Sequence, residues 1–180
     1  MGNEMLRKCL IGAVVANVGI LVATYVALPP FIAVLFGWHG YSTIWIEMVE
    51  YGIAMFWLML MGLLTVYALP WLVLKAPPIL VSLPNKHYWL DPQRKTETAR
   101  KLTAWMEVFG VGCYTFSSVI MLLILHANKC PAMRDYGLKM PCLNLTVFFA
   151  IVGIFVAFLL WWVVYSHWIF RLPKEKHYES

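Results

Sequence analysis

The stretch PNKHYWLDPQRKTETARK, residues 84–101, is rich in charge and separates two long apolar segments. The chain has 180 residues, of which 62% are apolar and only 13% are charged. Because soluble domains carry roughly 25% charged residues, this composition predicts a protein whose solvent is the lipid bilayer. The net charge of +5 is modest, and no basic face stands clear of the apolar segments. Nucleic acid is therefore not expected as a partner.

Four segments are apolar and long enough to cross a bilayer as helices, which takes about 20 residues. Proline pairs follow the first two, at residues 29–30 and 77–78, and proline interrupts a helix. No small-residue cleavage site precedes the first pair, so the first segment is expected to stay in the membrane rather than act as a cleaved signal peptide. The sequence therefore predicts an all-α protein with one membrane domain over residues 1–180. Its spans are expected at about residues 9–28, 50–74, 102–127 and 143–170.

The distribution of basic residues predicts the orientation of these spans. The two tails and the loop 75–101 would share one side of the membrane, and together they hold eleven Lys and Arg residues. The loops 29–49 and 128–142 on the other side hold three. Because basic residues are retained on the cytoplasmic side, we expect both termini and the loop 75–101 in the cytoplasm. The loops 29–49 and 128–142 are then expected in the periplasm.

The loop 75–101 has a local structure that can be predicted. Asp91 suits the N-cap and Pro92 the first position of a helix that runs into the third span. Tryptophan is enriched at the lipid headgroup level, where Trp89 and Trp105 are expected. The cations could simply contact anionic headgroups, each with a favourable interaction free energy of about 1 kcal/mol, or they could bind a partner protein. The residues expected to contact lipid or a partner are Lys86, Trp89, Arg94, Lys95, Arg100, Lys101 and Trp105.

Two segments carry a resemblance to a known group of proteins. Residues 84–94, PNKHYWLDPQR, followed by TET at 96–98, resemble the central loop of small uncharacterised bacterial membrane proteins with a PNKDYWL-like string. Residues 28–37, LPPFIAVLFG, resemble a short domain that this group shares with SdpI-type immunity proteins. The chain departs from the pattern at Leu35, where the group usually has histidine, and at His87, where aspartate is common. The resemblance implies a multi-pass protein of the bacterial inner membrane and supplies no reaction.

The expected outer side carries two candidate sites. Cys130 and Cys142 enclose eleven residues, and the oxidising periplasm permits a disulfide between them. Such a bridge would stabilise the fold by about 3 kcal/mol in the chain-entropy model, and the alternative is two free thiols. Imidazole and carboxylate side chains on this side could bind zinc, copper or iron, but they match no metal motif. We expect solvated residues and no cofactor; the weak metal candidates are His39, Glu47, Glu50 and His126.

Two polar residues are expected within the spans. Asn17 lies deep in the first span and should hydrogen-bond to a neighbouring helix, with Thr115, Ser117 and Ser118 as candidate partners. Glu107 lies about one turn inside the third span, and an ionisable residue there is a functional-site hypothesis by default. It is also close enough to the interface to pair with Arg100, Lys101 or a basic residue of the tail. Contact between helices is therefore the favoured role for both residues.

No enzyme is expected, because the sequence has no phosphate loop, nucleophile elbow or zinc-protease helix. Aromatic residues make up 16% of the chain and favour packing surfaces. The leading hypothesis is a non-catalytic accessory or stabilising subunit of a larger membrane complex, in contact with lipid and other membrane protein subunits. Two alternatives stay open: an SdpI-like immunity or sensing protein, and a small redox or metal-binding membrane protein.

Overall fold

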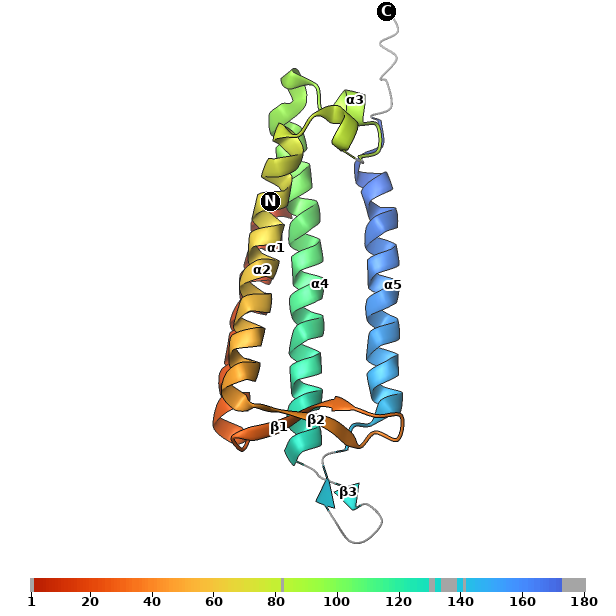
Figure 1. The fold of residues 1–180 in the computed structure, drawn as a ribbon. Coiled ribbons are helices and arrows are strands. Elements are labelled where there is room, and N and C mark those ends of the chain that lie inside the picture. The colour runs from red at the N-terminus through yellow and green to blue at the C-terminus, as the bar shows by residue number, and fades with distance from the viewer. Residues whose placement is uncertain (1, 82, 130–131, 134–138, 141, 173–180) are drawn as a thin grey trace, which may run out of the picture.

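The computed structural model describes residues 2–81, 83–129, 132–133, 139–140 and 142–172, which form long helices joined by short strands and turns (Figure 1). The helices are α1 (Gly2–Ala27), α2 (Met48–Lys75), α3 (Lys86–Trp89), α4 (Lys95–Lys129) and α5 (Leu145–Ile169). The strands are β1 (Phe31–Phe36), β2 (Ser42–Glu47), β3 (Ala132–Met133) and β4 (Lys139–Met140). Two 3-10 turns, η1 (Pro78–Leu80) and η2 (Pro92–Arg94), lie between α2 and α4.

Four helices are long and apolar enough to cross a membrane, and each overlaps one of the predicted spans. The shortest of them, α5, has 25 residues and is about 38 Å long at 1.5 Å per residue, which exceeds a hydrocarbon core of about 30 Å. The longest, α4, begins at Lys95, well before residue 102, because the polar residues of the basic loop are good helix formers. The start of α1 and the end of α5 lie at the same end of the bundle as α3 (Figure 1).

The prediction of an all-α protein with an irregular loop at residues 29–49 is wrong in one respect. Strands β1 and β2 form an antiparallel hairpin with an irregular register, and β3 pairs with β4 in a second short sheet. The sequences FIAVLF and STIWIE are rich in β-branched and aromatic residues, which favour strands. The hairpin turn uses Gly40 at φ 77°, a conformation that glycine adopts without strain. Hydropathy finds spans but does not distinguish a short hairpin from a loop.

Helices α1, α2 and α4 form the packed part of the bundle. Leu10 of α1 and Val66 of α2 are buried against α4 in one hydrophobic cluster. A Cβ atom added to Gly110 would lie 2.8 Å from Val66 and 2.9 Å from Leu10, so the glycine allows the three helices to approach closely. At the hairpin end, Ile32 and Met121 belong to a second buried cluster, which joins β1 to the same helices.

Helix α5 packs against α4 and is fastened at both ends (Figure 1). Just before α5, the backbone N–H of Leu143 donates to the carbonyl oxygen of Gly40 over 2.8 Å. Just after α5, the carbonyl oxygen of Phe170 accepts hydrogen bonds from the side chains of Asn85 and Trp89. The most apolar 18 residues of α5 include no buried side chain. The helix is therefore held in place while its outward face stays uncovered by the rest of the described chain.

Candidate functional site

The loop between α2 and α4 is fixed by its own sequence. Asn85 adopts the left-handed conformation at φ 54°, which asparagine tolerates better than most residues, and α3 begins directly after it. Its side-chain Nδ2 donates to the carbonyl oxygen of Phe170 over 2.9 Å. Asp91 caps the next turn by accepting a hydrogen bond from the N–H of Gln93, and Pro92 opens that turn. The predicted cap at Asp91 is confirmed, although the turn is 3-10 before α4 continues it.

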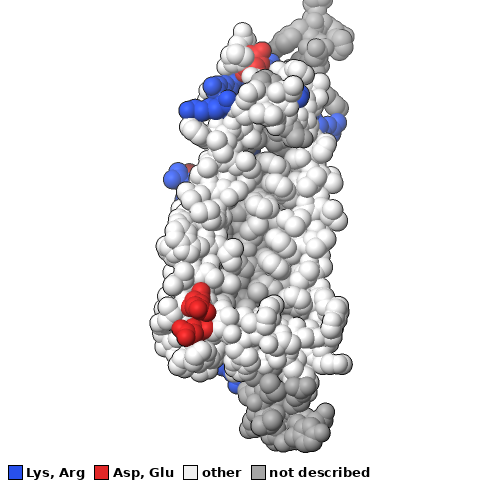
Figure 2. Space-filling model, in the orientation of Figure 1, with Lys and Arg blue, Asp and Glu red and all other residues white. Residues whose placement is uncertain are grey.

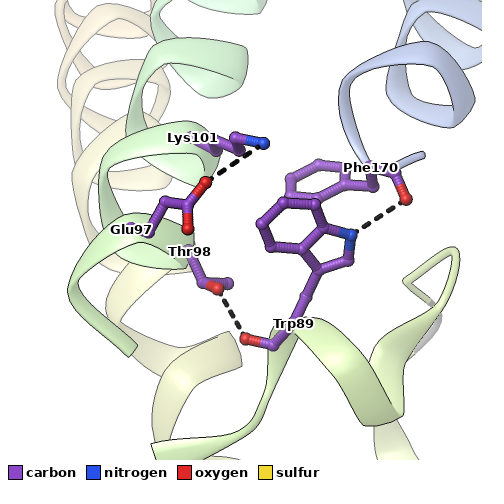
Figure 3. Close-up of polar contacts among 5 residues, drawn as sticks. All are labelled: Trp89, Glu97, Thr98, Lys101 and Phe170. Atoms are coloured by element: carbon purple, nitrogen blue, oxygen red, sulfur yellow. Dashed lines mark hydrogen bonds and ion pairs between the residues drawn. The ribbon is translucent and has the colours of Figure 1, made fainter. Parts of the chain in front are cut away.

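Trp89 differs from its predicted place at the lipid headgroups, because its side chain is fully buried within the chain. Its indole Nε1–H donates to the carbonyl oxygen of Phe170 over 2.9 Å, and the two rings meet edge to face (Figure 3). Thr98 donates its hydroxyl to the Trp89 carbonyl oxygen. A buried indole needs an acceptor, and the last carbonyl groups of a helix lack partners within it. Trp89 therefore joins the loop to the end of α5 rather than contacting lipid or a partner.

Trp105 also faces α5. Its ring stacks on that of Trp162, with centroids 4.0 Å apart and planes 6° apart. Each indole donates to the backbone carbonyl oxygen of the other residue, over 3.4 Å from Trp105 and 3.1 Å from Trp162. Both side chains are half-buried. This reciprocal pair links α4 to α5 near the basic end.

The cations of the basic loop surround this aromatic cluster. The Arg94 guanidinium lies 3.9 Å from the centroid of the Tyr88 ring, and the Lys101 ammonium lies 3.8 Å from the centroid of the Trp89 ring. Lys101 also pairs with Glu97 over 3.5 Å, the single ion pair among the described residues. Lys86 is half-buried, whereas Lys95 and Arg100 are exposed. Figure 2 shows Lys and Arg gathered at this end of the molecule, a broad band without charge below it, and a patch of Asp and Glu nearer the other end.

Asn17 lies where the sequence predicted a contact between helices. It is fully buried, and its Nδ2 donates to the hydroxyl of Ser118 over 3.0 Å and to the carbonyl oxygen of Tyr114 over 3.1 Å. Ser118 is one of the three hydroxyl residues named from the sequence as candidate partners. The Tyr114 hydroxyl donates in turn to the carbonyl oxygen of Met59 on α2. Asn17 and Tyr114 thus link α1, α4 and α2 through one chain of hydrogen bonds.

Glu107 is buried at 3% exposure, on the side of α4 that faces the bundle. No ion pair joins it to Arg100, Lys101 or another cation among the described residues. Its Oε2 atom has no hydrogen-bond partner among the described residues. An ionisable group in this position is costly unless paired, so a functional role for Glu107 stays a hypothesis.

The weak metal candidates of the outer side are spread over separate elements. His39 lies in the hairpin turn, Glu47 ends β2, Glu50 lies in the first turn of α2 and His126 in the last turn of α4. All four side chains are exposed. Within the part of the chain that the structure describes, no three His, Cys, Asp or Glu residues come together as a metal site would require. Cys130 lies outside the described residues, so its disulfide with Cys142 stays a prediction.

Asn128 is a structural residue that the sequence did not reveal. Its side-chain amide pairs with both backbone groups of Ala33, accepting from the N–H over 2.9 Å and donating to the carbonyl oxygen over 3.0 Å. The side-chain amide therefore bonds to β1 as the backbone of a neighbouring strand would, and it holds the hairpin against α4. An asparagine near the end of an apolar helix is the only sequence signal, and it does not indicate the partner.

No family model, curated protein or solved structure matches the chain. The resemblance of residues 84–94 and 28–37 to bacterial membrane proteins therefore stays a prediction. The geometry itself offers two surfaces for function. One is the outward face of α5, and the other is the cation-rich end around α3.

Proposed function

We propose that the protein is a non-catalytic accessory subunit that stabilises a larger complex in the bilayer by helix packing. The observation that carries the proposal is the exposure of α5: none of its most apolar 18 residues is buried, although hydrogen bonds fix both of its ends. Its exposed side chains include Ile154 at 71% and Val164 at 67% exposure. A helix that is placed firmly but shares little of its surface with its own bundle is suited to packing against another subunit.

The basic end supports the same proposal. Positive residues mark the cytoplasmic side of membrane proteins, so the loop 75–101 and both termini are assigned to the cytoplasm of a bacterial inner membrane. Lys95 and Arg100 are exposed there and make no ion pair within the described chain. They are available to acidic groups of a neighbouring subunit or to anionic headgroups.

Site-specific photo-crosslinking in native membranes tests the proposal. A photoreactive residue at Ile154 or Val164 is expected to capture one defined polypeptide, and native electrophoresis after gentle extraction should show the same species. Val26 on α1 is the control, since it is 80% exposed but lies on a different helix. Equal capture from Val26, or a lone monomer at every detergent concentration, would remove the basis for an accessory subunit.

A second candidate, an immunity or sensing protein, is favoured by the hairpin. Trp38 in its turn is 89% exposed, and Phe31 and Trp45 are exposed on its strands. Exposed aromatic side chains at a membrane surface are suited to contact a membrane-active peptide. Deleting the gene should then sensitise cells to such a toxin, and the Trp38→Ala variant should fail to restore resistance. Unchanged sensitivity of the deletion strain would reject this candidate.

A further inference from the structure

Two adjoining pockets lie at the cation-rich end of the bundle. The first, of about 530 Å³, lies between the end of α2, the segment 76–84, α4 and the end of α5. The second, of about 780 Å³, extends from the same segment toward α3. Both volumes fall within the range of roughly 300–1,000 Å³ that is typical of ligand pockets. The two pockets share the wall formed by Leu80, Val81, Leu83, Pro84, Trp105 and Ser166.

The two pockets differ in chemistry. The first is lined mainly by aliphatic side chains of α2, such as Leu72 and Val73, with Lys75 at the end of that helix. Leu72 is 51% exposed on a candidate span, so this pocket borders the hydrocarbon rather than bulk water. The second pocket is lined by Lys86 together with His87. Lys86 makes no ion pair within the described residues, so its charge is open to an anion.

An amphipathic anion fits this pair of pockets. We propose that they bind one anionic phospholipid, with an acyl chain in the first pocket and the phosphate beside Lys86 in the second. Basic pockets between membrane helices recognise lipid phosphates in this way. Ile79 and Leu80, which line the second pocket, are 85% and 75% exposed, as expected for apolar side chains at the level of the bilayer surface. The site is separate from the outward face of α5 and does not depend on an accessory role.

Native mass spectrometry of the full chain in a mild detergent tests this site. Phosphatidylglycerol is expected to form a one-to-one adduct, and phosphatidylcholine with the same acyl chains is expected to bind at least about fivefold more weakly. The Lys86→Gln variant should weaken phosphatidylglycerol binding by about fivefold. Lys95→Gln is the matched control, because it removes the same charge from the same end of the molecule but lines neither pocket.

A second pair of variants tests the acyl-chain pocket. Ala76 lines the first pocket, so Ala76→Phe should fill it and lower phosphatidylglycerol binding, whereas Ala157→Phe on exposed α5 should not. Equal losses in Lys86→Gln and Lys95→Gln would indicate nonspecific surface electrostatics and overturn the proposal. Equal binding of the two lipids would also overturn it. Binding of glycerol 3-phosphate as tight as that of the lipid would show a soluble phosphate site instead.

Discussion

Trp89 donates its indole N–H to the backbone carbonyl oxygen of Phe170 over 2.9 Å, and so ties the loop after α2 to the end of α5 (Figure 3). The Trp89 ring also lies beneath the Lys101 ammonium, 3.8 Å from its centroid. The basic loop is therefore built around a buried aromatic side chain. Two of its cations, Arg94 and Lys101, are held over the rings of Tyr88 and Trp89.

Replacing Trp89 with phenylalanine keeps an aromatic ring but removes the hydrogen bond to Phe170. Asn85 still donates to the same oxygen, so the free energy of unfolding in detergent should fall by only about 1 kcal/mol. Denaturant unfolding followed by circular dichroism measures this change. Trp38→Phe is the control, because Trp38 is 89% exposed and its replacement should change stability by less than about 0.5 kcal/mol. Equal effects of the two variants would contradict the assigned role of Trp89.

The hairpin should detach when Asn128 is replaced with alanine. Both backbone groups of buried Ala33 would lose their partner, which should lower the free energy of unfolding by about 2–4 kcal/mol. The rate of amide hydrogen exchange in β1 should rise strongly. Asn128→Asp keeps an acceptor for the Ala33 N–H and should give an intermediate effect. Unchanged exchange in Asn128→Ala would show that other contacts hold the hairpin.

The contact between Asn17 and Ser118 should appear as an energetic coupling in a double-mutant cycle. Hydrogen bonds between membrane helices contribute on average about 0.6 kcal/mol. The single variants Asn17→Ala and Ser118→Ala and their combination should therefore give a coupling of about that size in unfolding experiments. Thr115, on the same helix, has no described bond to Asn17, so the cycle with Thr115→Ala should give no coupling. A coupling as large with Thr115 would reject the specific pair.

The turn of the hairpin should not accept a side chain at Gly40. A Cβ atom there would lie 2.5 Å from the carbonyl oxygen of Leu143, and φ is 77°. We expect Gly40→Ala to lower the free energy of unfolding by more than about 1 kcal/mol and to loosen the start of α5. Gly12→Ala on α1 is the control, since nothing lies within 4 Å of its added Cβ. Similar stabilities of the two variants would contradict this contact.

The four long helices could be predicted because a span is a property of composition over about 20 residues. The partner of Asn17 could be narrowed to three hydroxyl residues, one of them Ser118, because a buried amide in lipid needs a polar neighbour on another helix. Both inferences need only the local sequence and the knowledge that the solvent is lipid.

The hairpin and the position of Trp89 could not be predicted in the same way. A six-residue strand such as FIAVLF has the composition of a span but not its length, and its docking on α4 depends on the distant Asn128. Trp89 suits a membrane surface by residue type, and only the end of α5 supplies its buried acceptor. These features depend on contacts between residues far apart in the sequence.

The proposed orientation and roles all depend on a chain that crosses the membrane four times with its basic end inside. Fusing a green fluorescent protein or an alkaline phosphatase after Ser180, and after His39 in the hairpin turn, measures this directly. We predict fluorescence without phosphatase activity after Ser180, and phosphatase activity without fluorescence after His39. Phosphatase activity after Ser180 with fluorescence after His39 would show the opposite orientation in the membrane and contradict the account.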